Sequence, residues 1–344
     1  MKSTIRDIAE ACGVSVSLVS RIMNGDKTLK CRQETRERVL KEIEDRLYVP
    51  DHHARMLAQS NLVTHRNLRV GYISYKGAGK TPNPYFDNII AGITTILTME
   101  EYEVKRFYID EVSELCRKNV PLSDKRFDGL ILFGDVPGHL VDYLYSQTRY
   151  LSSVYGSEIP SADFVGTNIV ETMNTAADYA RKLGFTRTGI LSGGDEKRER
   201  ALLQHMEEIG MEVDERYFLR AGNEYNLAYK TIAEKVRTET PPELLCCMND
   251  EMAIGAMDAL LDAGFRVPED VSVIGHDDIA RSAYCRVPLT TVRIYKEEIG
   301  RLVSDLLLER INYKRKFAVK TFIPCELVVR KSVRRKTKQE KSTT

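Results

Sequence analysis

From Leu68 onward the chain alternates short apolar runs with longer amphipathic stretches, and this alternation limits the fold more than any other feature. Several runs are apolar throughout, as expected of strands that are buried on both faces. Strands that alternate with helices form parallel sheets in α/β domains. The expected strands are Leu68–Ser74, Glu103–Ile109, Gly129–Phe133, Phe164–Gly166, Thr188–Ser192, Leu244–Cys247 and Val271–Gly275. The expected helices cover residues 85–100, 137–147, 169–183, 197–210, 224–237, 250–263 and 295–312, and an extended segment follows at 317–329.

Length and composition indicate a globular protein with more than one domain. The 344 residues suit a small domain plus a larger one, and 42% of them are hydrophobic, which is enough for a large core. The seven cysteines are odd in number and include no Cys-X-X-Cys pair, so neither a disulfide framework nor a zinc site is expected. There is no signal peptide and no run of ~20 apolar residues, so we expect a cytoplasmic protein without a membrane partner.

The motifs that would indicate an enzyme are missing. The sequence contains no Gly-X-Ser-X-Gly, no Gly-X-Gly-X-X-Gly after the first strand, no phosphate-binding P-loop and no His-Glu-X-X-His. We therefore predict that the protein is not an enzyme and has no catalytic residue, cofactor or metal. The net charge of +1 does not by itself indicate nucleic acid. A DNA-binding role has to be argued from a particular segment of the chain.

Residues 1–48 show helical patterns and no strand signal. A first amphipathic stretch ends at Gly13, and Ser15 can cap a second helix over Val16–Met23. A third amphipathic stretch runs from about residue 32 to residue 46. Two short helices joined by a glycine-containing turn and braced by a third helix form a helix-turn-helix module.

In such a module the second helix enters the major groove and presents its early residues to the base edges. Arg21 can donate two hydrogen bonds to a guanine, and Val16 can contact a thymine methyl group. Short polar side chains contact phosphates and position the module without reading the sequence. The predicted DNA contacts in this module are Thr4, Ser15, Val16, Ser17, Ser20, Arg21, Asn24 and Thr35. The alternative interpretation of Arg21 is a solvated surface charge.

The segment Thr4–Gly25 resembles the N-terminal signature of the lactose and galactose repressor (LacI/GalR) family, and the resemblance extends over residues 3–329. It implies an N-terminal all-α helix-turn-helix domain with a hinge helix. It also implies an α/β periplasmic-binding-protein-like (type I) core of two doubly wound parallel-sheet subdomains. A homodimer on double-stranded operator DNA is expected, because one module this small binds weakly and two half-sites supply the missing affinity.

Residues 49–61 resemble the hinge helix of that family. Pro50 is well placed at a helix start, and so short a helix is marginal alone. In the family this helix folds on the operator and a leucine enters the minor groove. Leu57 matches that leucine, Ala54 is the second predicted DNA contact, and the alternative is that Leu57 packs against its own domain. Asp51 stands where the family usually has Asn, which puts the DNA contact at that residue in question.

Residues 62–329 resemble the sensing domain of the family, in which a small-molecule effector binds between two subdomains. We predict that the chain crosses between the subdomains near residues 161, 291 and 320. The subdomains are then 62–160 with 292–320 and 161–291 with 321–329, followed by a basic disordered tail at 330–344.

Four motifs match the effector cleft of the family. Asn83–Phe86 offers aromatic rings for a sugar face, although Phe86 fits a core equally well. Arg198 matches an arginine that holds ligand hydroxyls, with Arg200 as its rival. In the third motif Asn249 faces the cleft while Asp250 caps a helix, and in the fourth Asp277 matches the ligand-binding aspartate. The predicted effector contacts are Tyr85, Phe86, Arg198, Tyr225, Asn249 and Asp277, where Tyr225 substitutes for the tryptophan that the chain lacks.

The resemblance implies a repressor of a carbohydrate operon, galactoside-like, whose effector is a sugar. Two departures limit the choice of ligand, because His276 replaces the usual aromatic residue before Asp277 and Thr167-Asn168 stands where an Asp is common. A purine or a protein corepressor stays open as the effector. A cytosolic sugar-binding protein without a DNA role stays open as a different class.

Overall fold

The computed structural model describes residues 5–23, 29, 31–46, 67–74, 83–156 and 159–335. The chain divides into two compact units, Met1–Arg66 and Asn67–Thr344. The predicted hinge at 49–61 lies outside the described residues.

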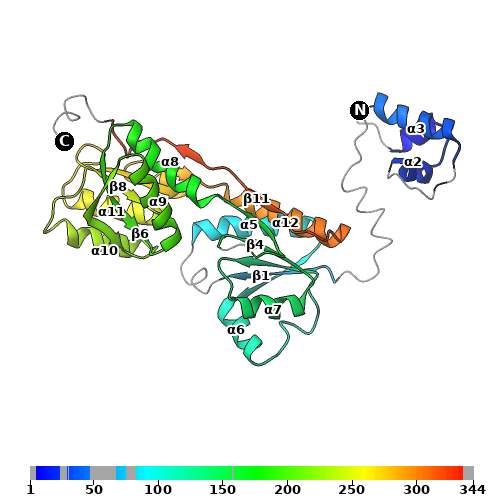
Figure 1. Cartoon of the computed structure of the whole chain (residues 1–344), viewed down its shortest axis with the longest axis horizontal. Helices are drawn as coiled ribbons and strands as arrows, with labels where there is room; N and C mark the ends of the chain where they lie inside the picture. Colours follow the sequence, from blue (N-terminus) through cyan, green and yellow to red (C-terminus); the bar gives the residue numbers. More distant parts are fainter. Residues whose placement is uncertain are drawn as a thin grey trace. The chain divides into compact units, whose positions relative to one another are not determined.

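The described part of the N-terminal unit contains the helices α1 (Ile5–Ala11), α2 (Val16–Met23) and α3 (Gln33–Asp45) (Figure 1). Ser15 caps α2, because its Oγ accepts a hydrogen bond from the backbone N–H of Leu18 at 3.2 Å. Ile8, Val19 and Val39, one from each helix, are fully buried in a common core. The predicted second and third helices are confirmed to within one residue at each end.

The first half of the second unit is a six-stranded sheet with the order β11-β5-β4-β3-β1-β2, in which every pairing is parallel. Its strands are β1 (Arg69–Ser74), β2 (Glu103–Tyr108), β3 (Gly129–Phe133), β4 (Tyr150–Val154), β5 (Asp163–Gly166) and β11 (Lys320–Phe322). Helices α5 (Pro84–Met99) and α12 (Lys296–Tyr313) cover one face, and α6 (Ile109–Arg117) and α7 (Gly138–Gln147) cover the other (Figure 1).

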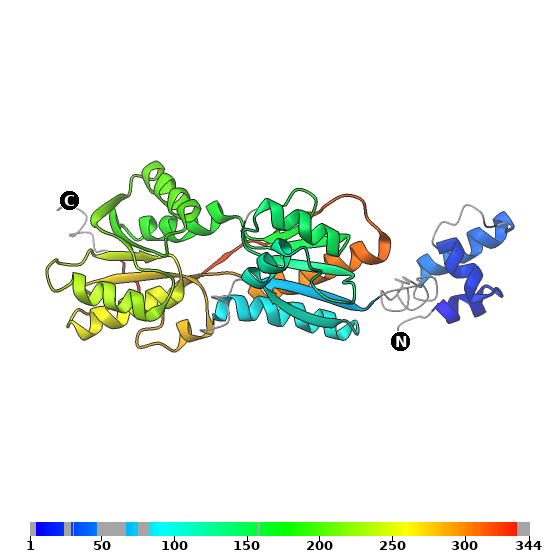
Figure 2. The same ribbon diagram turned by 90° about the horizontal axis from the view of Figure 1, so that it is seen from below.

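The second half repeats this layered plan with the order β12-β10-β9-β8-β6-β7, and only β12 runs antiparallel to its neighbour. Its strands are β6 (Arg187–Ser192), β7 (Glu212–Arg220), β8 (Leu244–Cys247), β9 (Ser272–Asp277), β10 (Thr290–Arg293) and β12 (Glu326–Val328). Helices α8 (Ile169–Lys182) and α9 (Glu196–Glu208) pack together, as do α10 (Tyr225–Lys235) and α11 (Asp250–Asp262) on the opposite face (Figure 2). A short 3₁₀ helix covers Ala280–Ala283. The predicted fold class of two parallel-sheet subdomains is confirmed.

Three segments connect the two halves, and each crossing lies a few residues later than predicted. β5 pairs with β4 and β11 in the first sheet, so the first crossing follows Gly166 and not residue 161. β10 ends at Arg293 in the second sheet, so the second crossing follows that residue and not residue 291. The third crossing lies between Phe322 and Glu326 and not at 320. The sheet to which a short strand belongs depends on distant partners, which the local pattern does not contain.

The sequence pattern did not predict β4, β7, β10 or α6. β4 has no apolar alternation because Ser152 and Ser153, two polar residues in succession, are both fully buried. β7 is the edge strand of the second sheet and carries several exposed charged side chains. Both strands are stabilised by pairing with a neighbouring strand of the sheet. Their own composition does not predict a strand.

The predicted disordered tail begins too early. Ser332 is fully buried, where its Oγ donates to the carbonyl of Val273 at 2.6 Å and accepts from the N–H of Thr290 at 2.8 Å. Arg330 donates to Asp278 at 2.7 Å. Residues 330–335 therefore belong to the fold in spite of their polar composition, whereas residues 336–344 lie outside the described part.

Helices α5 and α12 approach each other closely through two glycines. A Cβ atom on Gly92 would lie 2.2 Å from the carbonyl oxygen of Glu297, and one on Gly300 would lie 2.0 Å from that of Ile89. Each contact is with backbone, which cannot move aside as a flexible side chain can. The two glycines thus set the distance between these helices.

We predict that Gly300→Ala lowers the free energy of unfolding by about 1–3 kcal/mol, because the added methyl group must push the two helices apart. Urea unfolding of the full chain measures this. Gly138→Ala at the start of α7 is the matched control, since a Cβ there would meet nothing within 4 Å. Equal unfolding midpoints for the two variants would contradict the close-packing argument.

Candidate functional site

The exposed face of α2 carries the side chains predicted to contact DNA. Ser15, Val16, Ser17 and Arg21 are exposed and Ser20 is half-buried, while Val19 and Ile22 face the core. Thr35 is half-buried near the start of α3. The predicted contacts Thr4, Asn24, Ala54 and Leu57 lie outside the described residues. The helix therefore presents a polar face that includes one arginine to the outside of this unit.

The second unit contains a cleft of about 860 Å³ between its two sheets. All six predicted effector residues line it, together with residues that the sequence did not single out. The first half of the unit contributes Tyr85, Phe86, Tyr155 and Phe164, and the second contributes Arg198, Asn223, Tyr225, Asn249, Glu251, His276, Asp277 and Arg281. The carboxyl ends of the parallel strands meet at such a position in open α/β sheets.

Aromatic rings form one wall of the cleft. The ring centroids of Tyr85 and Phe86 lie 5.2 Å apart, and Tyr155 lies 6.0 Å from the first and 5.8 Å from the second. Phe86 also packs edge-on against buried Phe133 at 6.2 Å, so it belongs to the core and to the cleft at once. Burial raises the pKa of Tyr85. The wall therefore offers neutral ring surfaces to a ligand.

Arg198 places a positive charge on the opposite wall. Asp195 caps α9 by accepting a hydrogen bond from the backbone N–H of Arg198 at 3.2 Å, which fixes the first turn of the helix. The guanidinium donates to the carbonyl of Met248 at 2.5 Å and retains further N–H donors for a ligand. Arg200 is exposed and is not among the residues that line the cleft, so Arg198 is the arginine that reaches it.

Asn249 lines the cleft as predicted, but the helix cap predicted for Asp250 is supplied by Asn249. Asn249 caps α11, because its Oδ1 accepts from the N–H of Met252 at 2.7 Å, although it also lines the cleft. Asp250 is fully buried and accepts hydrogen bonds from Ser282 and Thr291, both at 2.6 Å. Burial raises the pKa of Asp250 to about 7. A local pattern cannot distinguish the two roles, because Ser282 and Thr291, the partners of Asp250, lie in a 3₁₀ helix and in β10, which are distant in sequence.

Tyr225 presents its ring to the cleft, but its hydroxyl is already used. The hydroxyl donates to Asp258 at 2.9 Å, and the guanidinium of Arg281 lies 4.6 Å from the ring centroid. The ring of Tyr225 is thus held in place by Asp258 at its hydroxyl and by Arg281 near its ring.

Asp277 ends β9 in an unusual backbone conformation, with φ values of 117° at Asp277 and 50° at Asp278. Non-glycine residues rarely adopt positive φ values. The buried ammonium group of Lys296 donates to the carbonyl oxygens of both residues and to that of Ile294 at 3.2 Å. Asp278 in turn accepts from Arg293 at 2.7 Å. These contacts hold the strained turn that directs Asp277 to the cleft.

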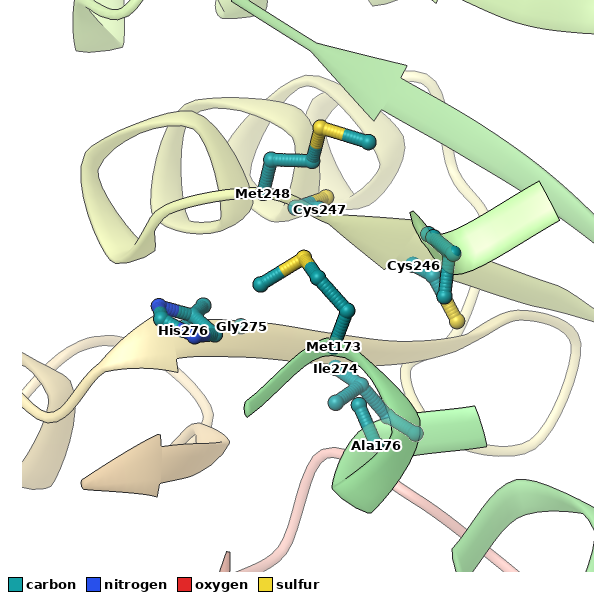
Figure 3. A pocket seen from close by; sticks show the side chains of 9 residues that line it. Met173, Ala176, Cys246, Cys247, Met248, Ile274, Gly275 and His276 are labelled. Carbon is teal, nitrogen blue, oxygen red and sulfur yellow. The ribbon is translucent and has the colours of Figure 1, made fainter. Parts of the chain in front are cut away.

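His276 lies beside Asp277 and was noted in the sequence only as a departure from the family. It is 6% exposed, and its Nδ1 lies 2.9 Å from Oδ1 of Asp277. Besides the cleft it lines a small cavity of about 10 Å³, which Figure 3 shows. The other residues around that cavity are Met173, Ala176, Leu202, Cys246, Cys247, Met248, Ile274 and Gly275.

Within the described ranges no group of three or more His, Cys, Asp or Glu side chains is arranged to hold a metal ion. None of the helices in those ranges has the length and hydrophobicity needed to cross a membrane.

Comparison with known proteins matches both units. The family described as bacterial regulatory proteins, lacI family, matches residues 4–51, and the periplasmic binding protein-like domain matches residues 177–333. The chain is 30% identical over 347 residues to the HTH-type transcriptional repressor PurR of Photobacterium profundum, covering 96% of this chain and 99% of that protein.

Two solved structures have the same fold. The cellobiose complex of the transcriptional regulator CelR aligns with a TM-score of 0.67 at 22% identity, over 96% of this chain and 99% of that one. The lac repressor dimer bound to operator and the anti-inducer ONPF aligns with a TM-score of 0.63 at 21% identity, over 96% and 99%.

We predict that Lys296→Met lowers the free energy of unfolding by about 1–3 kcal/mol, because it leaves buried carbonyl oxygens without their donor. Urea unfolding measures the change, and Lys182→Met on the exposed end of α8 is the control for loss of a lysine. If both variants unfold at the same urea concentration, the ammonium group does not hold the turn at Asp277.

Proposed function

Because the chain belongs to the lacI family of bacterial regulatory proteins and is a DNA-binding transcriptional regulator with an effector-binding domain, we propose that it represses a carbohydrate operon by binding operator DNA as a homodimer. In this proposal a neutral, hydroxyl-rich ligand of the sugar class occupies the cleft of the second unit and controls the affinity for the operator.

The observation that carries the choice of ligand is the division of the cleft into an aromatic wall and a polar wall. Tyr85 and Phe86 offer ring faces on which the apolar face of a sugar can stack. Arg198 and Asp277 offer paired donors and paired acceptors, which match vicinal hydroxyl groups. Positive groups (Arg198 and Arg281) and negative groups (Glu224, Glu251 and Asp277) both line the cleft, and this mixture of charges favours a neutral ligand.

The face of α2 supports the proposal for DNA. An exposed arginine at Arg21 suits the two acceptors of a guanine edge, and the apolar side chain of Val16, 40% exposed, suits a thymine methyl group. Ser20 and Thr35 are proposed to contact phosphates. Thr4, Asn24, Ala54 and Leu57 lie outside the described residues and stay predictions from the sequence.

Effector control requires the ligand to distinguish two conformations of the protein. A change of about 10³-fold in operator affinity needs a difference of roughly 4 kcal/mol between its binding free energies for the two states. Residues from both halves of the unit line the cleft, so closing it around a ligand moves the two halves relative to each other. The direction of the effect, induction or corepression, follows from which conformation the ligand favours.

A purine is the second candidate, because the relatives at 30% identity are named PurR. A planar base could lie against Tyr85 and Tyr155 with its edge toward Asp277. The same cleft therefore suits either class by shape, and a direct binding comparison separates them.

We predict that Arg21→Ala weakens binding to the preferred DNA site by roughly 5- to 150-fold, the loss of about 1–3 kcal/mol expected for one arginine–guanine contact. The preferred site is first selected from random duplexes, and fluorescence anisotropy then measures the affinity of each variant for that site. Lys41→Ala on α3 removes the same charge from an exposed position outside the reading face. If no duplex is selected, the chain is a sugar-binding protein without a DNA role.

We predict that one or more of D-galactose, lactose, cellobiose and D-ribose raises the melting temperature, while hypoxanthine and guanine do not. Arg198→Ala should weaken binding of the active sugar by roughly 10- to 150-fold, as expected for charge-assisted hydrogen bonds worth about 1.5–3 kcal/mol. Arg200→Ala, its exposed neighbour on α9, is the control and should bind normally. A shift with the purines alone would favour the second candidate.

A further inference from the structure

We propose that Nε2 of His276 is a hydrogen-bond acceptor that selects ligands with an N–H or O–H donor at this point of the cleft. This inference rests on the proposed function, because it assigns a specificity-determining residue to the same ligand site. His276 is not one of the residues that the sequence analysis placed in the site.

The two nitrogens of the ring have different surroundings. Nδ1 lies 2.9 Å from a carboxylate oxygen of Asp277, whereas Nε2 is buried and has no hydrogen-bond partner within the described structure. Buried polar atoms in folded proteins are nearly always paired. The exception here occurs in a side chain that lines a ligand cleft, where a bound molecule can supply the partner.

The partner of Nδ1 determines which nitrogen carries the proton. An ionised carboxylate can only accept a hydrogen bond, so Nδ1 must be the N–H donor to Asp277. In a neutral imidazole the other nitrogen, Nε2, then has a free lone pair and can only accept. Asp277 therefore has two functions, since it faces the ligand itself and fixes the tautomer of its neighbour.

The surroundings also keep the ring neutral. Burial lowers the pKa of His276 below its usual 6.5, and the positive charges of Arg198 from α9 and Lys296 from α12 add to this effect, while Asp277 opposes it. At neutral pH the acceptor is thus available.

The small cavity beside the ring does not offer an equally strong partner. Its volume of about 10 Å³ is close to that of one water probe. Apart from two cysteine thiols, the side chains around it are apolar (Figure 3). Thiols are weak hydrogen-bond donors, so a water molecule held there would be a weaker partner for Nε2 than the N–H or O–H group of a ligand. The cleft, which His276 also lines, is where a ligand can supply that stronger donor.

Two neighbouring acceptors, the carboxylate of Asp277 and Nε2 of His276, have a consequence for the ligand. A molecule with two adjacent donors satisfies both, as a vicinal diol does and as a purine edge with an N–H and an amino group does. A molecule with a methyl ether, a methylene or a lone pair at one of these places leaves a buried acceptor unpaired, which is strongly unfavourable. The site therefore rejects ligands that lack one of the two donors, and this rejection does not depend on the size of the ligand.

The first test needs no ligand. ¹⁵N NMR of the full chain with labelled histidine at pH 7.5 should show one residue with a protonated Nδ1 and a bare Nε2, and this signal should be missing in His276→Gln. An Nε2–H tautomer or an imidazolium at this position would overturn the proposal.

The second test uses whichever compound of the sugar and purine panel binds. If that is D-galactose, its 2-, 3-, 4- and 6-deoxy derivatives are measured by calorimetry, and if it is guanine, its N-methyl derivatives are. One derivative should bind the native protein at least tenfold more weakly than the parent compound. His276→Phe should bind the parent more weakly and lose this discrimination. His276→Gln, whose side-chain oxygen can take the place of Nε2, should retain part of it.

The outcomes separate this inference from the proposed function. If a panel compound binds and His276→Phe discriminates among the derivatives as the native protein does, the role of His276 is wrong and the proposed function stands. If no derivative is rejected by the native protein, the role is also wrong. If no panel compound binds at all, the proposed ligand class fails and the inference fails with it. Should His276→Phe not fold, the glutamine variant and the derivative series on the native protein still decide the question.

Discussion

The proposed effector site depends on a buried lysine, Lys296, that contacts the end of β9. The chain turns there through two successive residues with positive φ, Asp277 and Asp278, and Lys296 binds the carbonyl oxygens of both. A buried ammonium group is stable only when acceptors replace the water it has lost, and burial lowers the pKa of Lys296 accordingly. The lysine and the strained turn thus stabilise each other. Lys296 does not itself line the cleft, but it fixes the backbone turn that orients the carboxylate of Asp277 there.

The same lysine connects the two walls of the cleft. It is the first residue of α12, and α12 packs against α5 so closely that Gly92 and Gly300 have no room for a side chain. The N-terminal end of α5 carries Tyr85 and Phe86, which form the aromatic wall. The closely packed pair of helices thus links the residues of the aromatic wall to the lysine that holds the turn at Asp277.

The DNA-binding unit is small by comparison, and its charge is nearly balanced. Residues 1–60 contain eleven Lys and Arg against nine Asp and Glu, a surplus of two. Attraction to phosphates is therefore modest for one copy, and in the proposed homodimer base contacts and the joint action of two copies supply the remaining affinity.

The sequence alone determined the helices of the N-terminal unit, the two parallel-sheet halves and six residues of the cleft, because helix period, apolar runs and family motifs are local in the chain. Only the tertiary structure decided which side chain serves which purpose. Arg198 and not Arg200 reaches the cleft, and Asn249 and not Asp250 caps its helix. His276 enters the site beside Asp277. The crossing points shifted for the same reason, since strand pairing and burial are set by segments far apart in sequence, and no local pattern records those partners.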